Sequence, residues 1–178
     1  MKLRLAFVNF SMGITYQDKL QPKLQLAGLF SGIYFRPGDE WRQYRIHLNE
    51  IPTAEELSAF DVLVMSGSYC CINDELPKVK KFGEVLKEVM ETNQTIRIHA
   101  ACFGHQLICS VLGVEIFRHK RVLGPESVQF TLPEQLKLPS LQSIFNQGTF
   151  RIYEEHVDSA KEVPPGFILV GSSPTCEV

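Results

Sequence analysis

The stretch Thr95-Ile-Arg-Ile-His-Ala-Ala-Cys-Phe-Gly-His-Gln-Leu-Ile-Cys-Ser-Val-Leu112 decides the fold. Its first four residues, 95–98, are mostly β-branched and predict a buried strand. Apolar residues then recur at helical spacing up to Gly113, which predicts a helix that ends there. A short turn of small residues around Cys102 separates the two elements. A strand, a tight turn and a helix in this order form the pattern of a nucleophile elbow, which holds the side chain of the turn at the sheet edge.

Cys102 has a structural and a functional interpretation. Cysteine is among the residues most often buried, and it packs as a small apolar side chain without any reactivity. At the first turn of a helix, however, the helix dipole and free N–H groups favour the thiolate and should lower the pKa of the thiol. The small residues on both sides of Cys102 favour the functional interpretation, as does Gly104, which lets the helix pack close to the strand. Cys109 lacks this setting and is assigned to the core.

Length and composition predict a single globular domain. The 178 residues are 44% hydrophobic and 21% charged, with a net charge of −2, so no electrostatic feature predicts binding to nucleic acid or to a membrane surface. No apolar run approaches the roughly 18 residues of a membrane span. The segment from Met1 to Val8 carries charges and predicts a first strand rather than a signal peptide. The five cysteines are odd in number and two are adjacent, which predicts a reducing, cytoplasmic location.

Strand and helix patterns alternate through the first 112 residues. Strands are expected at 3–10, 41–48, 61–65 and 95–98, and helices at 16–31, 52–57, 76–93 and after Cys102. Thr53 is the expected cap of the helix at 52–57, with Glu56 three residues later. This alternation predicts an α/β protein with a parallel sheet, helices on both faces, and a site beyond the carboxyl ends of the strands. After Val114, short strands are expected at 114–117, 127–132, 150–155 and 167–171, separated by turns such as Gly124-Pro125. These predict antiparallel additions at the edge of the sheet.

Three motifs together resemble the class I glutamine amidotransferase family. Val64-Met-Ser-Gly-Ser68 is similar to the family's oxyanion loop, and Cys102-Phe-Gly-His-Gln106 to its cysteine elbow. Glu155-His-Val-Asp-Ser159, followed by a Pro-x-Gly and a Ser-Ser pair, is similar to its late His-x-Asp segment. The resemblance extends from about Asp61 to Glu177 and is nearest to the stand-alone type, akin to γ-glutamyl peptidases and the glutaminase domain of GMP synthetase. It implies a flavodoxin-like, three-layer α/β/α fold.

The resemblance also implies a role for each matched residue. Cys102 would attack the side-chain amide of glutamine, or a γ-glutamyl amide, and form a thioester. The backbone N–H groups of Gly67 and Phe103 would hold the oxyanion, and Gln106 and His156 would bind the substrate. The family's glutaminase step needs no cofactor and no metal. The partner would be a synthase that receives ammonia, or a second copy of the chain.

The sequence departs from the family pattern at two places. Ala100 stands where the family usually has glycine, a change that the turn tolerates unless the residue needs a positive φ. The family's Phe-His-Pro-Glu motif, whose His is the general base, does not occur in the 178 residues. We therefore expect a single domain over 1–178 that lacks its C-terminal strand and helix, with little or no turnover and with marginal stability or a dimer. A non-catalytic binding module and a truncated product of a longer gene remain alternatives.

Other histidines are candidates for a base or for metal ligands. His156 and Asp158 have the spacing of the missing pair, but in the family this segment lies at the rim of the pocket, where its neighbours contact substrate without acting as a base. His99, Cys102 and His105 have the spacing of metal ligands, yet three residues around a sharp turn rarely converge on one ion, and we reject a zinc site. His47 and His119 have no partner in the sequence and are assigned to the surface.

Overall fold

The computed structural model describes residues 2–11, 26–131 and 148–177. The chain divides into two compact units, 1–112 and 113–178, which are described separately. The prediction of one domain over 1–178 stays a prediction. Within the described residues, no helix is long and apolar enough to cross a membrane.

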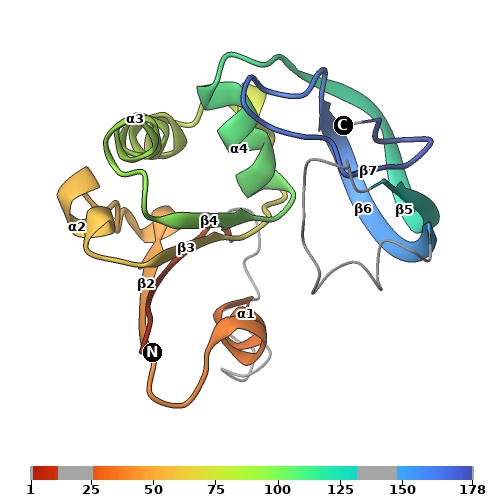
Figure 1. Ribbon diagram of the computed structural model, residues 1–178. Coiled ribbons are helices and arrows are strands. Elements are labelled where there is room, and N and C mark those ends of the chain that lie inside the picture. The colour runs from red at the N-terminus through yellow and green to blue at the C-terminus, as the bar shows by residue number, and fades with distance from the viewer. Residues whose placement is uncertain (1, 12–25, 132–147, 178) are drawn as a thin grey trace. The chain divides into compact units, whose positions relative to one another are not determined.

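The first unit is built on a four-stranded parallel sheet (Figure 1). Its strands are β1 (Arg4–Asn9), β2 (Glu40–Arg45), β3 (Val62–Met65) and β4 (Arg97–Ala100), and their order in the sheet is β2-β1-β3-β4. This is the strand order of flavodoxin-like folds, which confirms the predicted fold class. The carboxyl ends of β3 and β4 lie side by side, because Met65 pairs with Ala100.

Helices cover both faces of this sheet. Figure 1 shows α1 (Leu26–Tyr34) on one face and α2 (Ala54–Ser58), α3 (Pro77–Thr92) and α4 (Phe103–Val111) on the other. Successive residues of β1 explain the two layers, because their side chains point to opposite faces. Phe7 packs on Phe30 of α1, with 5.0 Å between ring centroids, whereas Val8 belongs to the core cluster that includes Phe82 and Leu107 of α3 and α4.

Two helices begin within two residues of their predicted starts. Thr53 caps α2: its hydroxyl accepts a hydrogen bond from the Glu56 N–H at 3.1 Å, and the Glu56 carboxylate accepts one from the Thr53 N–H at 2.9 Å. This reciprocal pair is a capping box, as predicted. Helix α3 begins at Pro77, because proline fits the first helical position, where an N–H has no partner within the helix.

Three predicted boundaries in the first unit are wrong. β2 ends at Arg45, because Ile46–Leu48 forms a 3₁₀ turn that Asn49 closes at a φ of 66°. β4 begins at Arg97 rather than Thr95, because the Asn93 side chain accepts hydrogen bonds from the backbone N–H groups of Thr95 and Ile96. Its residues are exposed or half-buried, since among the described strands it pairs with β3 alone. α1 continues past Gly32 to Tyr34, and its predicted start at residue 16 lies outside the described residues.

The second unit is an antiparallel sheet of two long strands and one short one. β5 (Ile116–Phe130) pairs along its length with β6 (Thr149–Ala160), and its last residues pair with β7 (Gly171–Ser172). The antiparallel pairing is as predicted, but the strands form a sheet of their own rather than additions to the edge of the parallel sheet. The prediction of four short strands is also wrong. Gly124-Pro125 lies inside β5 and is not a turn. At these two residues β5 pairs with β6 on one edge and has no described strand on the other edge, and sheets tolerate proline at such a position. The strand predicted at 167–171 is also wrong except for Gly171.

Candidate functional site

Cys102 occupies the turn between β4 and α4. Its φ of 49° and ψ of −111° lie in a region that residues with a side chain rarely adopt, and its side chain is exposed. Such a conformation costs on the order of 1–3 kcal/mol and persists only where neighbouring structure enforces it. Hydrogen bonds enforce it on both sides: the Ala101 N–H donates to the Met65 carbonyl at 3.0 Å, and the Gln106 N–H donates to the Cys102 carbonyl at 2.9 Å.

Gly67, in the loop that follows β3, lies against Cys102. A Cβ atom built on Gly67 would be 3.3 Å from the Cys102 Cβ and 3.8 Å from its Sγ. Two predicted site residues that are far apart in sequence therefore meet at the carboxyl edge of the sheet. The parallel order of β3 and β4 brings them together, because both strands end at that edge.

Phe103 and Gln106 both belong to the first turn of α4. The Phe103 ring is fully buried and packs on Phe10, with 5.2 Å between centroids, while its backbone directly follows Cys102. Gln106 is 6% exposed. The roles expected for these residues, an oxyanion donor and a substrate ligand, stay predictions.

Two histidines flank Cys102 in sequence, three residues before it and three after it. Burial lowers the pKa of His105 and that of His99 below the ordinary value of 6.5. His99 packs beside Tyr34 of α1, with 5.0 Å between ring centroids, and the Nε2 atom of His105 lies 3.6 Å from the Cys109 Sγ. Cys102 directly precedes the first turn of α4, where a helix dipole favours a negative charge.

His156, the predicted site residue of the second unit, lies on β6. Its Nε2 atom is 3.0 Å from the Glu154 carboxylate, which the Ser173 hydroxyl also faces at 3.5 Å. Asp158, two residues after His156, pairs with Arg118 instead. The partner of His156 is thus Glu154 rather than Asp158, and the late motif forms a polar network within its own sheet.

The assignment of His119 to the surface is wrong. His119 is half-buried: its Nδ1 lies 2.8 Å from the Lys120 carbonyl and its Nε2 lies 2.9 Å from the Ser159 hydroxyl. Its ring meets that of His156 edge to face, with 4.9 Å between centroids. Its partner Ser159 is 40 positions away in the chain, and the pairing of β5 with β6 brings the two together.

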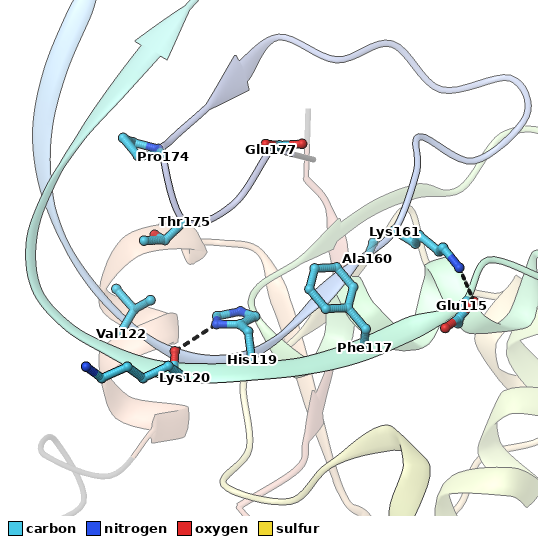
Figure 2. A pocket seen from close by; sticks show the side chains of 10 residues that line it. All are labelled: Glu115, Phe117, His119, Lys120, Val122, Ala160, Lys161, Pro174, Thr175 and Glu177. Atoms are coloured by element: carbon cyan, nitrogen blue, oxygen red, sulfur yellow. Dashed lines mark hydrogen bonds and ion pairs between the residues drawn. The ribbon is translucent and has the colours of Figure 1, made fainter.

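A cleft of about 700 Å³ opens beside His119, between β5 and residues 174–177 (Figure 2). Figure 2 shows Phe117 and His119 rising from β5 at its base, with the ion pair of Lys161 and Glu115 at one end. Lysine and glutamate side chains both line it, so the cleft presents neither sign of charge alone. In the described part of the chain, no three His, Cys, Asp or Glu side chains gather as metal ligands.

Sequence comparison finds similarity to glutamine amidotransferase-like proteins, gamma-glutamyl peptidases and GMP synthase chains. A glutamine amidotransferase-like protein of Schizosaccharomyces pombe is 29% identical over 129 residues, which cover 72% of this chain and 50% of that protein. The chain is homologous to glutamine amidotransferase-like proteins. Gamma-glutamyl peptidase 4 of Arabidopsis thaliana is 26% identical over 79% of this chain and 56% of its own length. A glutamine-hydrolysing GMP synthase chain of Saccharolobus solfataricus is 30% identical over 70% of this chain and 61% of its own.

Solved structures share the glutamine amidotransferase fold. A glutamine amidotransferase of Thermotoga maritima superposes with a TM-score of 0.73 at 17% identity, over 99% of this chain and 70% of that one. A GMP synthase chain of Thermoplasma acidophilum gives 0.68 at 21% identity, over 100% of this chain and 76% of that one. No protein-family model matches the chain. The chain spans about half the length of the first curated relatives that it matches.

Proposed function

We propose that the chain carries a glutaminase-type site in which Cys102 is the nucleophile. The substrate is glutamine or a γ-glutamyl amide. The observation that carries the proposal is the exposed thiol of Cys102, held at positive φ at the start of α4 with Gly67 against it. This geometry supports the assignment of a nucleophile elbow, in which a strained turn presents the reactive atom at the sheet edge.

The reaction proceeds in two acyl-transfer steps. The Cys102 thiolate adds to the amide carbon, the C–N bond breaks, and ammonia or an amine leaves with a proton from the medium. Water then adds to the thioester, the C–S bond breaks, and glutamate and the thiol are released. The backbone N–H groups of Gly67 and Phe103 hold the oxyanion in both steps. Such donors are effective because the turns fix them before the charge develops.

The relatives support this substrate class by their names. They include gamma-glutamyl peptidases and a glutamine-hydrolysing component of GMP synthase, and a component of that kind implies a synthase partner that uses the ammonia. For this chain, either such a synthase or a second copy of the chain is the proposed partner. No cofactor is proposed, and a cytoplasmic location remains our expectation.

A non-catalytic binding module is the second candidate. The 178 residues contain no Phe-His-Pro-Glu motif, so the general base that the family resemblance implies has no counterpart in this sequence. Loss of one member of a catalytic triad commonly lowers the rate by several orders of magnitude. We therefore expect these 178 residues to bind the substrate and to form the thioester at Cys102 slowly, with little or no turnover.

The test is covalent labelling of the thiol followed by intact-mass measurement. The chain is incubated with a glutamine-mimicking diazoketone, with and without excess glutamine. Cys102→Ala is the test variant, and Cys176→Ala, which removes another partly exposed thiol, is its matched control. We expect one adduct, blocked by glutamine and by Cys102→Ala, and retained in Cys176→Ala.

Two results would decide against the enzyme. An unlabelled chain, or an adduct that glutamine does not block, would rule out a glutamine site at Cys102. Glutamine binding measured by calorimetry that persists in Cys102→Ala, without labelling of the unsubstituted chain, would favour the binding module.

A further inference from the structure

Ser66, at the end of β3, makes two side-chain hydrogen bonds in a fully buried position. Its Oγ accepts a hydrogen bond from the Phe10 N–H at 2.9 Å and donates one to the Gly67 carbonyl at 3.0 Å. Its own N–H donates to the Val8 carbonyl at 3.1 Å. Ser66 thus fastens the loop beside Cys102 to the end of β1.

The direction of each bond follows from the chemistry of a hydroxyl. A serine hydroxyl has one hydrogen and accepts through its lone pairs. An amide N–H can only donate, so the bond from Phe10 uses a lone pair of Oγ. The single hydroxyl hydrogen is therefore available for the Gly67 carbonyl. Together the two hydrogen bonds fix the orientation of the Ser66 hydroxyl.

The bond to Gly67 fixes a peptide plane next to the thiol. No described peptide bond is cis, so the carbonyl of Gly67 and the N–H of Ser68 point in opposite directions. With the carbonyl turned to the buried Ser66 hydroxyl, the N–H of Ser68 is directed away from that hydroxyl. Glycine has wide backbone freedom, and Gly67 has no side chain that would hold this plane.

We propose that Ser66 is a positioning residue that locks the Gly67–Ser68 peptide beside Cys102. This inference rests on the proposed function, since it assigns to Ser66 the orientation of the loop that stabilises the oxyanion. Ser66 touches neither substrate nor thiol in this scheme. It acts through the backbone, and its loss leaves the carbonyl of Gly67 free to turn toward the site.

The test separates the reactivity of the thiol from the stabilisation of the oxyanion. Labelling by the glutamine-mimicking diazoketone gives a maximal rate and a half-saturating concentration, and iodoacetamide reports the thiol alone. For Ser66→Ala we expect the maximal rate of diazoketone labelling to fall by about tenfold or more. The loss should stay smaller than the roughly 10²-fold loss that follows removal of an oxyanion donor itself. The half-saturating concentration and the iodoacetamide rate should change by less than about twofold.

Two further variants serve as controls. Ser66→Thr keeps the hydroxyl and should restore most of the labelling rate. Thr53→Ala removes another structural hydroxyl from the same unit, at the cap of α2, and should leave both labelling rates unchanged. Equal diazoketone rates for Ser66→Ala and the unsubstituted chain would overturn the inference, and so would a parallel loss of iodoacetamide labelling.

Amide hydrogen exchange tests Ser66 independently of the chemistry. If the unsubstituted chain takes up no diazoketone, the proposed function fails, and the exchange rate of the Phe10 N–H then decides the role of Ser66. We expect that rate to rise at least tenfold in Ser66→Ala and by no more than about fivefold in Thr53→Ala, which acts only through the stability of the whole unit. An unchanged Phe10 rate in Ser66→Ala would show that the hydroxyl does not hold the loop.

Discussion

The first turn of α4 touches the end of β3 at Gly104 and Met65. A Cβ atom built on Gly104 would lie 2.8 Å from the Met65 Cβ and 3.1 Å from the Ser66 carbonyl oxygen. Real Cβ atoms essentially never approach that closely, so the helix can reach the strand only because residue 104 has no side chain. This contact confirms the prediction that Gly104 permits close packing of helix and strand.

Gly104→Ala should therefore destabilise the first unit. Overpacking of this kind costs about 1–3 kcal/mol, because the neighbours include backbone atoms that move little. Gly32→Ala in α1, where nothing lies within 4 Å, is the matched control and should stabilise by up to about 1 kcal/mol, because alanine favours a helix over glycine. Urea unfolding followed by the fluorescence of Trp41, the chain's single tryptophan, measures both. Equal effects of the two substitutions would contradict the prediction.

The capping box of α2 gives a second prediction. Thr53→Ala should lower the free energy of unfolding by about 1 kcal/mol, because the Glu56 N–H loses its side-chain acceptor. Thr53→Ser keeps an acceptor in place and should cost less than half as much. The same fluorescence measurement applies, and a loss in Thr53→Ser equal to that in Thr53→Ala would show that the hydroxyl is not what matters.

The two arginine pairs of the second unit should differ in their contribution to stability. Arg118 Nε lies 3.1 Å from the Asp158 carboxylate, whose side chain is only 4% exposed, whereas Arg121 pairs with the exposed Glu155. Arg118→Ala should cost about 1–3 kcal/mol, because it removes a charged hydrogen bond to a buried carboxylate. Arg121→Ala should cost less than about 1 kcal/mol. Thermal unfolding followed by circular dichroism measures both, and equal losses would contradict the assignment.

Two histidines of the first unit, the exposed His99 and the half-buried His105, predict a pH dependence of stability below about pH 6.5. Desolvation lowers the pKa values of His105 and His99 below 6.5 in the folded chain, so the unfolded chain binds protons first as the pH falls. Stability is therefore fully present above about pH 6.5 and is lost as the pH falls through the lowered folded values. A hydrogen bond from Arg45 lowers the pKa of Glu50 below its ordinary value of 4.5. Glu50 therefore changes the free energy of unfolding only below about pH 4.5, at more acidic pH than the histidines.

The matching experiment uses His105→Gln and His99→Gln, singly and together. Each single substitution should flatten the pH dependence in part, and the double substitution should flatten it most. Urea unfolding at half-unit steps of pH provides the measurement. A stability that rises as the pH falls from 7 to 5 would contradict the direction of both shifts.

Local signals in the sequence predict most of the first unit. The apolar run of β3, the amphipathic pattern of α3 and the capping box at Thr53 each act over a few residues, and all three form where expected. The meeting of Gly67 with Cys102 also follows, because parallel strands end at a common edge. The start of β4 does not follow, since the Asn93 side chain competes for backbone N–H groups that a strand pattern assigns to the sheet.

The second unit is less predictable because its partners are distant in sequence. Gly124-Pro125 has the composition of a turn, yet pairing with β6 extends the backbone there. His119 has no neighbour in sequence that marks it as more than a surface residue, and its bond to Ser159 spans 40 positions. Ser66 is likewise inconspicuous in sequence, since its role depends on the distant N–H of Phe10.

The register of β5 and β6 has a consequence for the order in which the second unit folds. Gln129 and Thr149, paired at one end of the ribbon, are 20 positions apart, whereas Ile116 and Ala160, paired at the other, are 44 apart. Closing the shorter loop first costs about 0.7 kcal/mol less chain entropy. The pairing of β5 with β6 should therefore begin at Gln129 and Thr149 and extend toward Ile116 and Ala160, so that the contacts of Ser159 and His156 form late. Substitutions at that end should accelerate unfolding more than they slow folding.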